Sequence, residues 1–133
     1  MNILIVDDSR LLRISNERAL VKAGHHVISA EDGEAGLRLT LEHKPDLVVL
    51  DMMLPKLSGT DVLRAIRNHP DTASIPVLVL SALPQCNENK LLSEGATAYF
   101  QKSGLLGENG STHFVNAVER VLVKAKVKVA AAH

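Results

Sequence analysis

The fold of this chain is indicated most clearly by one segment, Asp46-Leu-Val-Val-Leu-Asp51-Met-Met-Leu-Pro55-Lys-Leu-Ser-Gly59. Residues 47–50 are apolar throughout and include two valines, which is typical of a strand buried on both faces of a parallel sheet. The strand ends on Asp51, and Pro55 and Gly59 indicate a turn directly after it. Because open α/β sheets bind ligands outside the carboxyl ends of their strands, we expect Asp51 to be the reacting residue.

The composition is that of one ordinary globular domain. The chain has 133 residues, 46% of them hydrophobic, and its 15 basic residues balance its 15 acidic ones. Neither this balance nor the 2% aromatic content favours binding to nucleic acid or to an anionic membrane. Cys86 is the only cysteine, and the apolar start of the chain is too short for a signal peptide or a membrane span. These features favour a cytoplasmic protein.

The rest of the chain repeats the pattern of a short apolar strand followed by a helix. Strands are expected at 3–6, 27–30, 47–51, 77–80 and 97–101, and helices at 10–23, 33–43, 60–68, 88–94 and from a cap at Ser111 onward. Such alternation predicts a doubly wound, five-stranded parallel sheet with five helices on its two faces. We expect one domain over residues 1–124, followed at 125–133 by a tail or the start of a linker.

Four of the expected strands end on a residue that can do chemistry, and these ends share one edge of the sheet. The first strand delivers Asp7 and Asp8, the third Asp51, the fourth Ser81 and the fifth Lys102. Three converging carboxylates repel one another, and a hard divalent cation such as Mg²⁺ relieves the repulsion. A carboxylate beside such an ion can act as a nucleophile and form an aspartyl phosphate. Lys102 would neutralise the phosphoryl oxygens, and Ser81 would donate a hydrogen bond to one of them.

With these residues in place, the chain resembles a response-regulator receiver domain, the phosphoacceptor module of two-component signalling. The matching features are Asp7-Asp8, the run from Leu50 to Pro55 with Gly59 after it, Ser81-Ala82 and Lys102. The resemblance implies a flavodoxin-like sheet of strand order 2-1-3-4-5. It also implies that Asp8, Asp51 and the backbone carbonyl of Met53 hold Mg²⁺, with Asp7 reaching the ion through water.

The resemblance further implies what the domain does and with which partners. A sensor histidine kinase or phosphotransfer protein would phosphorylate Asp51, and Ser81 and Tyr99 would then switch the surface of the fourth helix, fifth strand and fifth helix. That surface could also carry a homodimer, and the output partner or fused effector domain stays open. The domain would not be an enzyme, apart from catalysing its own phosphotransfer and slow dephosphorylation.

Two other readings stay open. A haloacid-dehalogenase-like phosphatase also uses an aspartyl nucleophile, but its two acids stand in an Asp-x-Asp pattern, whereas Asp7 and Asp8 are adjacent. A receiver-like interaction module that works without phosphorylation is the other alternative. One departure from the family pattern supports this alternative: Ser103 follows Lys102, where most members have proline.

Overall fold

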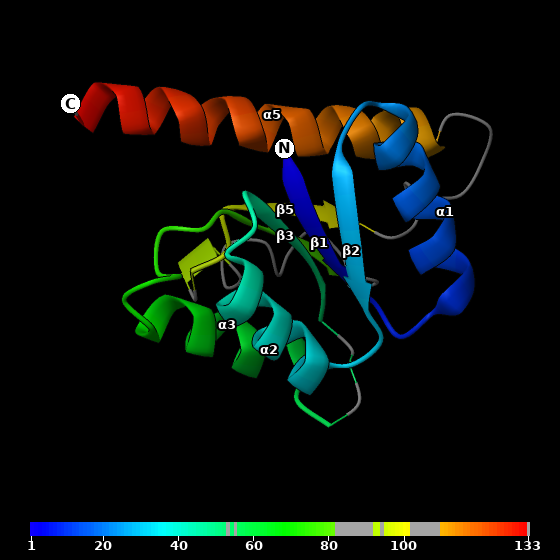
Figure 1. Cartoon of the computed structure of the whole chain (residues 1–133), viewed down its shortest axis with the longest axis horizontal. Coiled ribbons are helices and arrows are strands. Elements are labelled where there is room, and N and C mark those ends of the chain that lie inside the picture. The colour runs from blue at the N-terminus through cyan, green and yellow to red at the C-terminus, as the bar shows by residue number, and fades with distance from the viewer. Residues whose placement is uncertain (53, 55, 82–91, 94, 102–109, 133) are drawn as a thin grey trace.

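The computed structural model describes residues 1–52, 54, 56–81, 92–93, 95–101 and 110–132. From β1 to β4 the strands and helices alternate along the chain as the sequence predicts, and α5 follows β5 (Figure 1). The strands are β1 (Asn2–Val6), β2 (His26–Ala30), β3 (Leu47–Asp51), β4 (Val77–Ser81) and β5 (Ala98–Gln101). The helices are α1 (Arg10–Lys22), α2 (Gly33–His43), α3 (Gly59–Asn68) and α5 (Gly110–Ala132).

The five strands form one parallel sheet in the order β2-β1-β3-β4-β5. This order confirms the flavodoxin-like, doubly wound fold. It places β3 at the centre of the sheet, where all five of its residues are buried. Asp51 pairs in register with Leu80, so the last residues of β3 and β4 lie side by side at the carboxyl edge.

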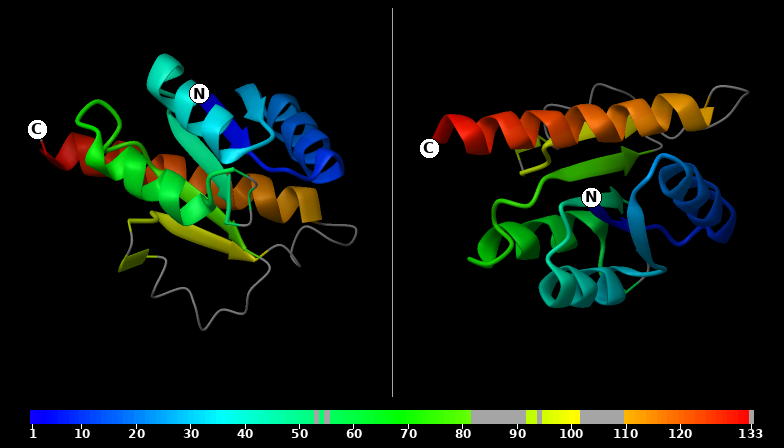
Figure 2. Two further views of the ribbon diagram at one scale, coloured as in Figure 1. Left: turned by 90° about the horizontal axis from the view of Figure 1, so that it is seen from below. Right: turned by 45° about the horizontal axis from the view of Figure 1, so that its top comes forward.

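The two faces of the sheet carry separate hydrophobic cores. Because side chains alternate along a strand, Val48 and Leu50 of β3 pack on one face and Leu47 and Val49 on the other. The first face is covered by α2 and α3, and the second by α1 and α5 (Figures 1 and 2). Helix α5 turns an apolar stripe toward the second face, and these residues of it are buried: Phe114, Val118, Val121 and Leu122.

Side-chain caps fix where the helices begin. Ser9 caps α1 and Ser58 caps α3, each accepting a hydrogen bond from a backbone N–H three residues on. Asp32 does the same for α2. The predicted cap at Ser111 is wrong, because α5 already begins at Gly110 and Ser111 lies inside the helix. The helix expected at 88–94 falls largely outside the described residues. Of this range the structure describes only Leu92 and Ser93, and both are helical.

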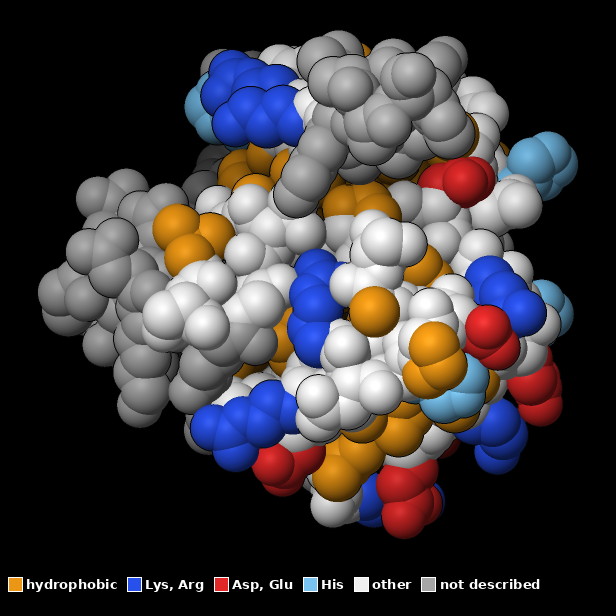
Figure 3. All heavy atoms as spheres, turned by 90° about the vertical axis from the view of Figure 1, so that its left-hand side faces the viewer, with side chains coloured by type: hydrophobic (Ala, Val, Ile, Leu, Met, Phe, Trp, Pro, Cys, Tyr) orange, Lys and Arg blue, Asp and Glu red, His pale blue; other side chains and the backbone are white. Residues whose placement is uncertain are grey.

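Past residue 124, α5 continues as helix to Ala132 and extends beyond the sheet (Figure 1). The assignment of residues 125–133 to a tail or linker stays a prediction. On the face at the left-hand side of Figure 1, basic and acidic side chains are interspersed with apolar ones (Figure 3). This mixture agrees with a net charge of zero.

Arg67, near the end of α3, joins the segments that lead into β4 and β5. Its guanidinium donates hydrogen bonds to the backbone oxygens of Ala73, Ile75 and Gly95 and to the hydroxyl of Thr97. Burial lowers the pKa of Arg67 from its ordinary value. Its oxygen acceptors offset that loss of solvation. The side chain therefore links α3 to the two segments that lead into β4 and β5.

We expect Arg67→Ala to lower the free energy of unfolding by about 2–3 kcal/mol, because several hydrogen bonds to a charged group are lost. Urea unfolding followed by circular dichroism measures the change. Arg38→Ala on the exposed face of α2 is the matched control and should stay within about 0.5 kcal/mol of the parent. If both variants lose the same free energy of unfolding, the hydrogen bonds of Arg67 add nothing to stability.

Candidate functional site

Three carboxylates meet at the carboxyl edge of the sheet. Asp7 and Asp8 directly follow β1, and Asp51 is the last residue of β3, the neighbouring strand. One carboxylate oxygen from each lies within 4.8 Å of the others. Asp7 and Asp51 are buried, whereas Asp8 is exposed, so the cluster has one side toward solvent. The structure therefore brings together the three acids whose convergence the sequence predicts.

The backbone around Asp7 is held by two local contacts. Its Oδ1 accepts a hydrogen bond of 2.9 Å from the N–H of Ser9, which turns the chain from β1 into α1. The guanidinium of Arg13, one turn into the helix, donates to the carbonyl oxygen of Asp7 at 2.8 Å. Arg13 is not among the site residues predicted from the sequence, although a basic residue in the first turn of a helix that follows an acidic strand end is a usable signal.

The cluster has the chemistry of a Mg²⁺ site. Mg²⁺ takes oxygen ligands at 2.0–2.1 Å in octahedral geometry, which puts ligand oxygens roughly 3–4 Å apart. Three carboxylate oxygens within 4.8 Å of one another lie close to that spacing. The donor set of Asp7, Asp8 and Asp51 therefore fits such an ion. Met53, the fourth expected ligand, lies outside the described residues.

Of the remaining predicted site residues, Ser81 and Tyr99 are described and Lys102 lies outside the described residues. Ser81 ends β4, the strand beside β3, and is 1% exposed. Tyr99 lies on β5, paired with Val79, and its half-buried side chain packs against the core on the α2–α3 face. Both positions agree with the roles expected for these residues, and the roles themselves stay predictions.

Gly59, the first residue of α3, lies close to the end of β3. The N–H of Gly59 donates to the carbonyl oxygen of Met52 at 3.2 Å. A Cβ atom at Gly59 would lie 2.5 Å from the carbonyl oxygen of Asp51, so a side chain there would push the loop off the strand end. This is the physical reason for a glycine eight residues after the acid.

Asp32 is a second acid whose environment the sequence did not reveal. The backbone N–H of Ala35, which donates to its Oδ1 at 2.8 Å, lowers the pKa of Asp32 below its ordinary value, and nearby Lys56 lowers it further. Because the folded protein favours the charged form, this carboxylate adds stability above its unfolded pKa. That contribution is lost as the pH falls through the lower pKa of the folded state.

We therefore expect the free energy of unfolding of the parent to fall more steeply below about pH 4 than that of Asp32→Asn, whose amide keeps the helix cap but cannot titrate. Urea unfolding between pH 6 and pH 3 compares the two slopes. Parallel curves would show that Asp32 does not link folding to protons.

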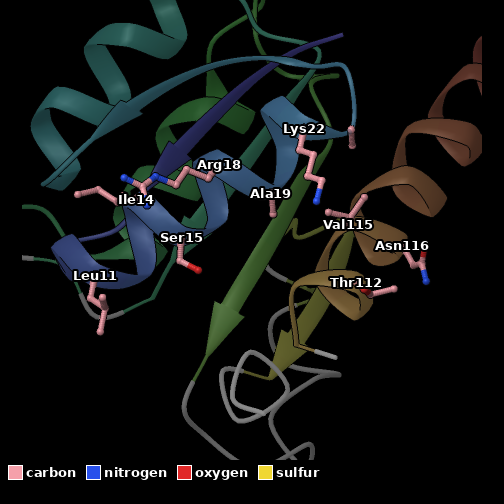
Figure 4. A pocket seen from close by; sticks show the side chains of 10 residues that line it. Leu11, Ile14, Ser15, Arg18, Ala19, Lys22, Thr112, Val115 and Asn116 are labelled. Carbon is pink, nitrogen blue, oxygen red and sulfur yellow. The ribbon is translucent and has the colours of Figure 1, made fainter. Parts of the chain in front are cut away.

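A separate hollow of about 710 Å³ lies between α1 and α5 (Figure 4). Helix α1 lines it with Leu11, Ser15 and Lys22 among others, and α5 with Val115 and Asn116. None of the three clustered carboxylates lines this hollow.

Comparison with known proteins identifies the family of this chain. The family model of the response regulator receiver domain matches residues 3–107. The chain belongs to this family. It is therefore a receiver domain of two-component phosphorelay signalling, and the recognition made from the sequence is confirmed. Receiver domains interact with histidine kinases or phosphotransfer proteins, and they are generally not metabolic enzymes.

The relatives are longer proteins. The chain is 37% identical to a gliding motility regulatory protein of Myxococcus xanthus over 91% of its own length and 15% of that protein. It is 40% identical to the response regulator MprA of Mycobacterium sp. (strain KMS) over 81% of its own length and 46% of the relative. Thus the chain spans less than half of these relatives.

Solved structures agree with this assignment. NtrX from Brucella abortus superposes with a TM-score of 0.86 at 25% identity, over 98% of this chain and 29% of NtrX. The chemotaxis response regulator CheY4 of Vibrio cholerae, at 24% identity, has the same fold, with a TM-score of 0.80 over 90% of this chain and 97% of CheY4. Among the described helices, none combines the length and the apolar character needed to cross a bilayer.

Proposed function

We propose that this receiver domain accepts a phosphoryl group on Asp51 from a sensor histidine kinase or phosphotransfer protein. The observation that carries the proposal is the approach of Asp7, Asp8 and Asp51 to within 4.8 Å at the carboxyl edge of the sheet. Grouping three acids costs free energy in the folded protein, because their charges repel. A bound divalent cation offsets this repulsion and can also hold the oxygens of an anionic substrate.

The transfer is a displacement at phosphorus. A carboxylate oxygen of Asp51 attacks the phosphorus atom, a P–O bond forms, and the P–N bond to the donor histidine breaks. The electron pair of that bond leaves with the imidazole. The product is an acyl phosphate at the end of β3, a strand that is buried along its whole length and holds its last residue in place.

Asp8, Asp51 and the backbone carbonyl of Met53 would hold Mg²⁺, and Asp7 would reach it through water. When bound, the ion neutralises part of the negative charge on the phosphoryl oxygens. Lys102 would supply further positive charge, and the hydroxyl of Ser81 would donate a hydrogen bond to a phosphoryl oxygen. Burial of Ser81 and Asp51 on adjacent strands supports this pairing of roles.

The output is a change of surface that follows phosphorylation. Movement of Ser81 toward the phosphoryl group would let Tyr99 turn inward and alter the face formed by the fourth helix, β5 and α5. Tyr99 is already half-buried on β5. An output partner, a fused effector domain or a second copy of the chain would read that face, and we expect the protein to work in the cytoplasm.

The test is incubation with Mg²⁺ and acetyl phosphate, followed by intact mass. The proposal expects a mass gain of one phosphate that excess EDTA prevents. No gain with Mg²⁺ would favour the alternative of an interaction module that works without phosphorylation. A gain that EDTA leaves unchanged would contradict the role given to the carboxylate cluster.

A further inference from the structure

The loop that leaves β3 touches the turn between β2 and α2. Lys56 Nζ lies 3.6 Å from Asp32 Oδ2. In the adjacent position, a Cβ atom at Gly33 would overlap the carbonyl oxygen of Leu57 and lie 2.8 Å from its carbonyl carbon. Two residues of the turn therefore meet two residues of the loop that are more than twenty positions further along the chain.

The contact at Gly33 is a contact with backbone, which a neighbouring side chain cannot relieve by changing rotamer. Any side chain at position 33 has to displace the peptide at Leu57. The neighbouring Lys56 has a φ of 66°, a left-handed conformation that a lysine rarely adopts. Such a conformation persists where the surroundings hold it, and the pair with Asp32 is one such restraint.

The loop is also held where it meets α3. Gly59 donates to the carbonyl oxygen of Met52, and it approaches the backbone of Asp51 too closely for a side chain. The described residues of this loop therefore lie against the strand end at Met52 and Gly59 and against the β2–α2 turn at Lys56 and Leu57. In sequence this segment carries Met53, whose carbonyl is an expected Mg²⁺ ligand, and it directly follows Asp51, another.

We propose that Asp32 and Gly33 are positioning residues for the Mg²⁺ site. They hold the loop at Lys56 and Leu57 and so fix the direction in which the carboxylate of Asp51, the residue before this loop, would face the ion. Neither residue touches the ion, and both act through the loop. The inference rests on the proposed function, because it assigns the support of the same site.

The test is a Mg²⁺ titration of the full chain, followed through backbone amide shifts by nuclear magnetic resonance, alongside urea unfolding. Gly33→Ala is expected to weaken Mg²⁺ binding by about tenfold or more, since lost support around metal ligands typically costs 10–100-fold in affinity. Lys56→Gln removes only an exposed ion pair and is expected to weaken binding by about two- to threefold.

Gly24→Ala is the matched control. Gly24 also has a positive φ, of 98°, so alanine is strained there, yet a Cβ atom at this position meets nothing within 4 Å. It lies in the turn between α1 and β2, before the amino end of β2, away from the acids. This variant should lose stability while keeping the Mg²⁺ affinity of the parent within about twofold.

Gly33→Ala that loses stability but keeps the parent's Mg²⁺ affinity would overturn the inference, because the contact would then serve folding alone. If Gly33→Ala does not fold, unchanged affinity in Lys56→Gln would overturn it instead. A parent that binds Mg²⁺ but gains no phosphate would refute the proposed function and leave the positioning role to be decided by the titration. A parent that binds no Mg²⁺ would refute both.

Discussion

Asp51→Asn should gain no phosphate under conditions in which the parent gains one. The amide has nearly the shape of the carboxylate but cannot attack phosphorus, so the rate should fall by at least about a thousandfold. Asp51 is 1% exposed and ends a fully buried strand, so an uncharged side chain of the same size should leave the fold intact. Intact mass after incubation with Mg²⁺ and acetyl phosphate measures the effect, and circular dichroism checks the fold.

Asp46→Asn is a matched control, because Asp46 directly precedes the same strand at its other end. It is exposed, and its Oδ2 accepts a hydrogen bond from the N–H of Asn2 at 2.7 Å. This variant should gain phosphate at the rate of the parent. Phosphate gained equally fast by Asp51→Asn would show that another residue is the acceptor, and the proposed function would need a different nucleophile.

The fold was predictable because a strand that is buried on both faces has an uninterrupted apolar sequence. Residues 47–50 and 77–80 are apolar without interruption, and both became central strands whose alternate side chains enter the two cores. Alternation with helices then required parallel strands. The exact start of α5 was not predictable, because serine favours a cap but the backbone became helical one residue earlier, at Gly110.

The carboxylate cluster was predictable for a topological reason. Asp8 and Asp51 are 43 positions apart, yet adjacent parallel strands bring their carboxyl ends to the same edge. No such rule joins Asp32 to Lys56 or Gly33 to Leu57. Those contacts depend on the orientation of two loops in the folded chain. In the sequence, Asp32-Gly33 indicated only the start of a helix. Arg67 likewise gave no sign that its acceptors would come from the two segments that lead into β4 and β5.

Asp8→Asn should change stability in opposite directions without and with Mg²⁺. In the metal-free protein the three carboxylates, with oxygens within 4.8 Å, repel one another, so removing one charge should raise the free energy of unfolding by about 0.5–1 kcal/mol. The same change removes a ligand charge and should weaken Mg²⁺ binding by at least about tenfold. Urea unfolding in EDTA and in rising MgCl₂ measures both effects.

The two effects should make the stability curves cross. Mg²⁺ stabilises the folded state by an amount that grows with its concentration relative to the dissociation constant, reaching about 2.7 kcal/mol at a hundredfold excess. The parent, with the tighter site, should therefore overtake Asp8→Asn as Mg²⁺ rises. Asp71→Asn, which removes an exposed acid whose partner Lys44 lies 3.8 Å away, should respond to Mg²⁺ as the parent does. Curves for Asp8→Asn and the parent that stay parallel would mean that Asp8 does not hold the ion, and the metal site would have to be built on Asp7 and Asp51.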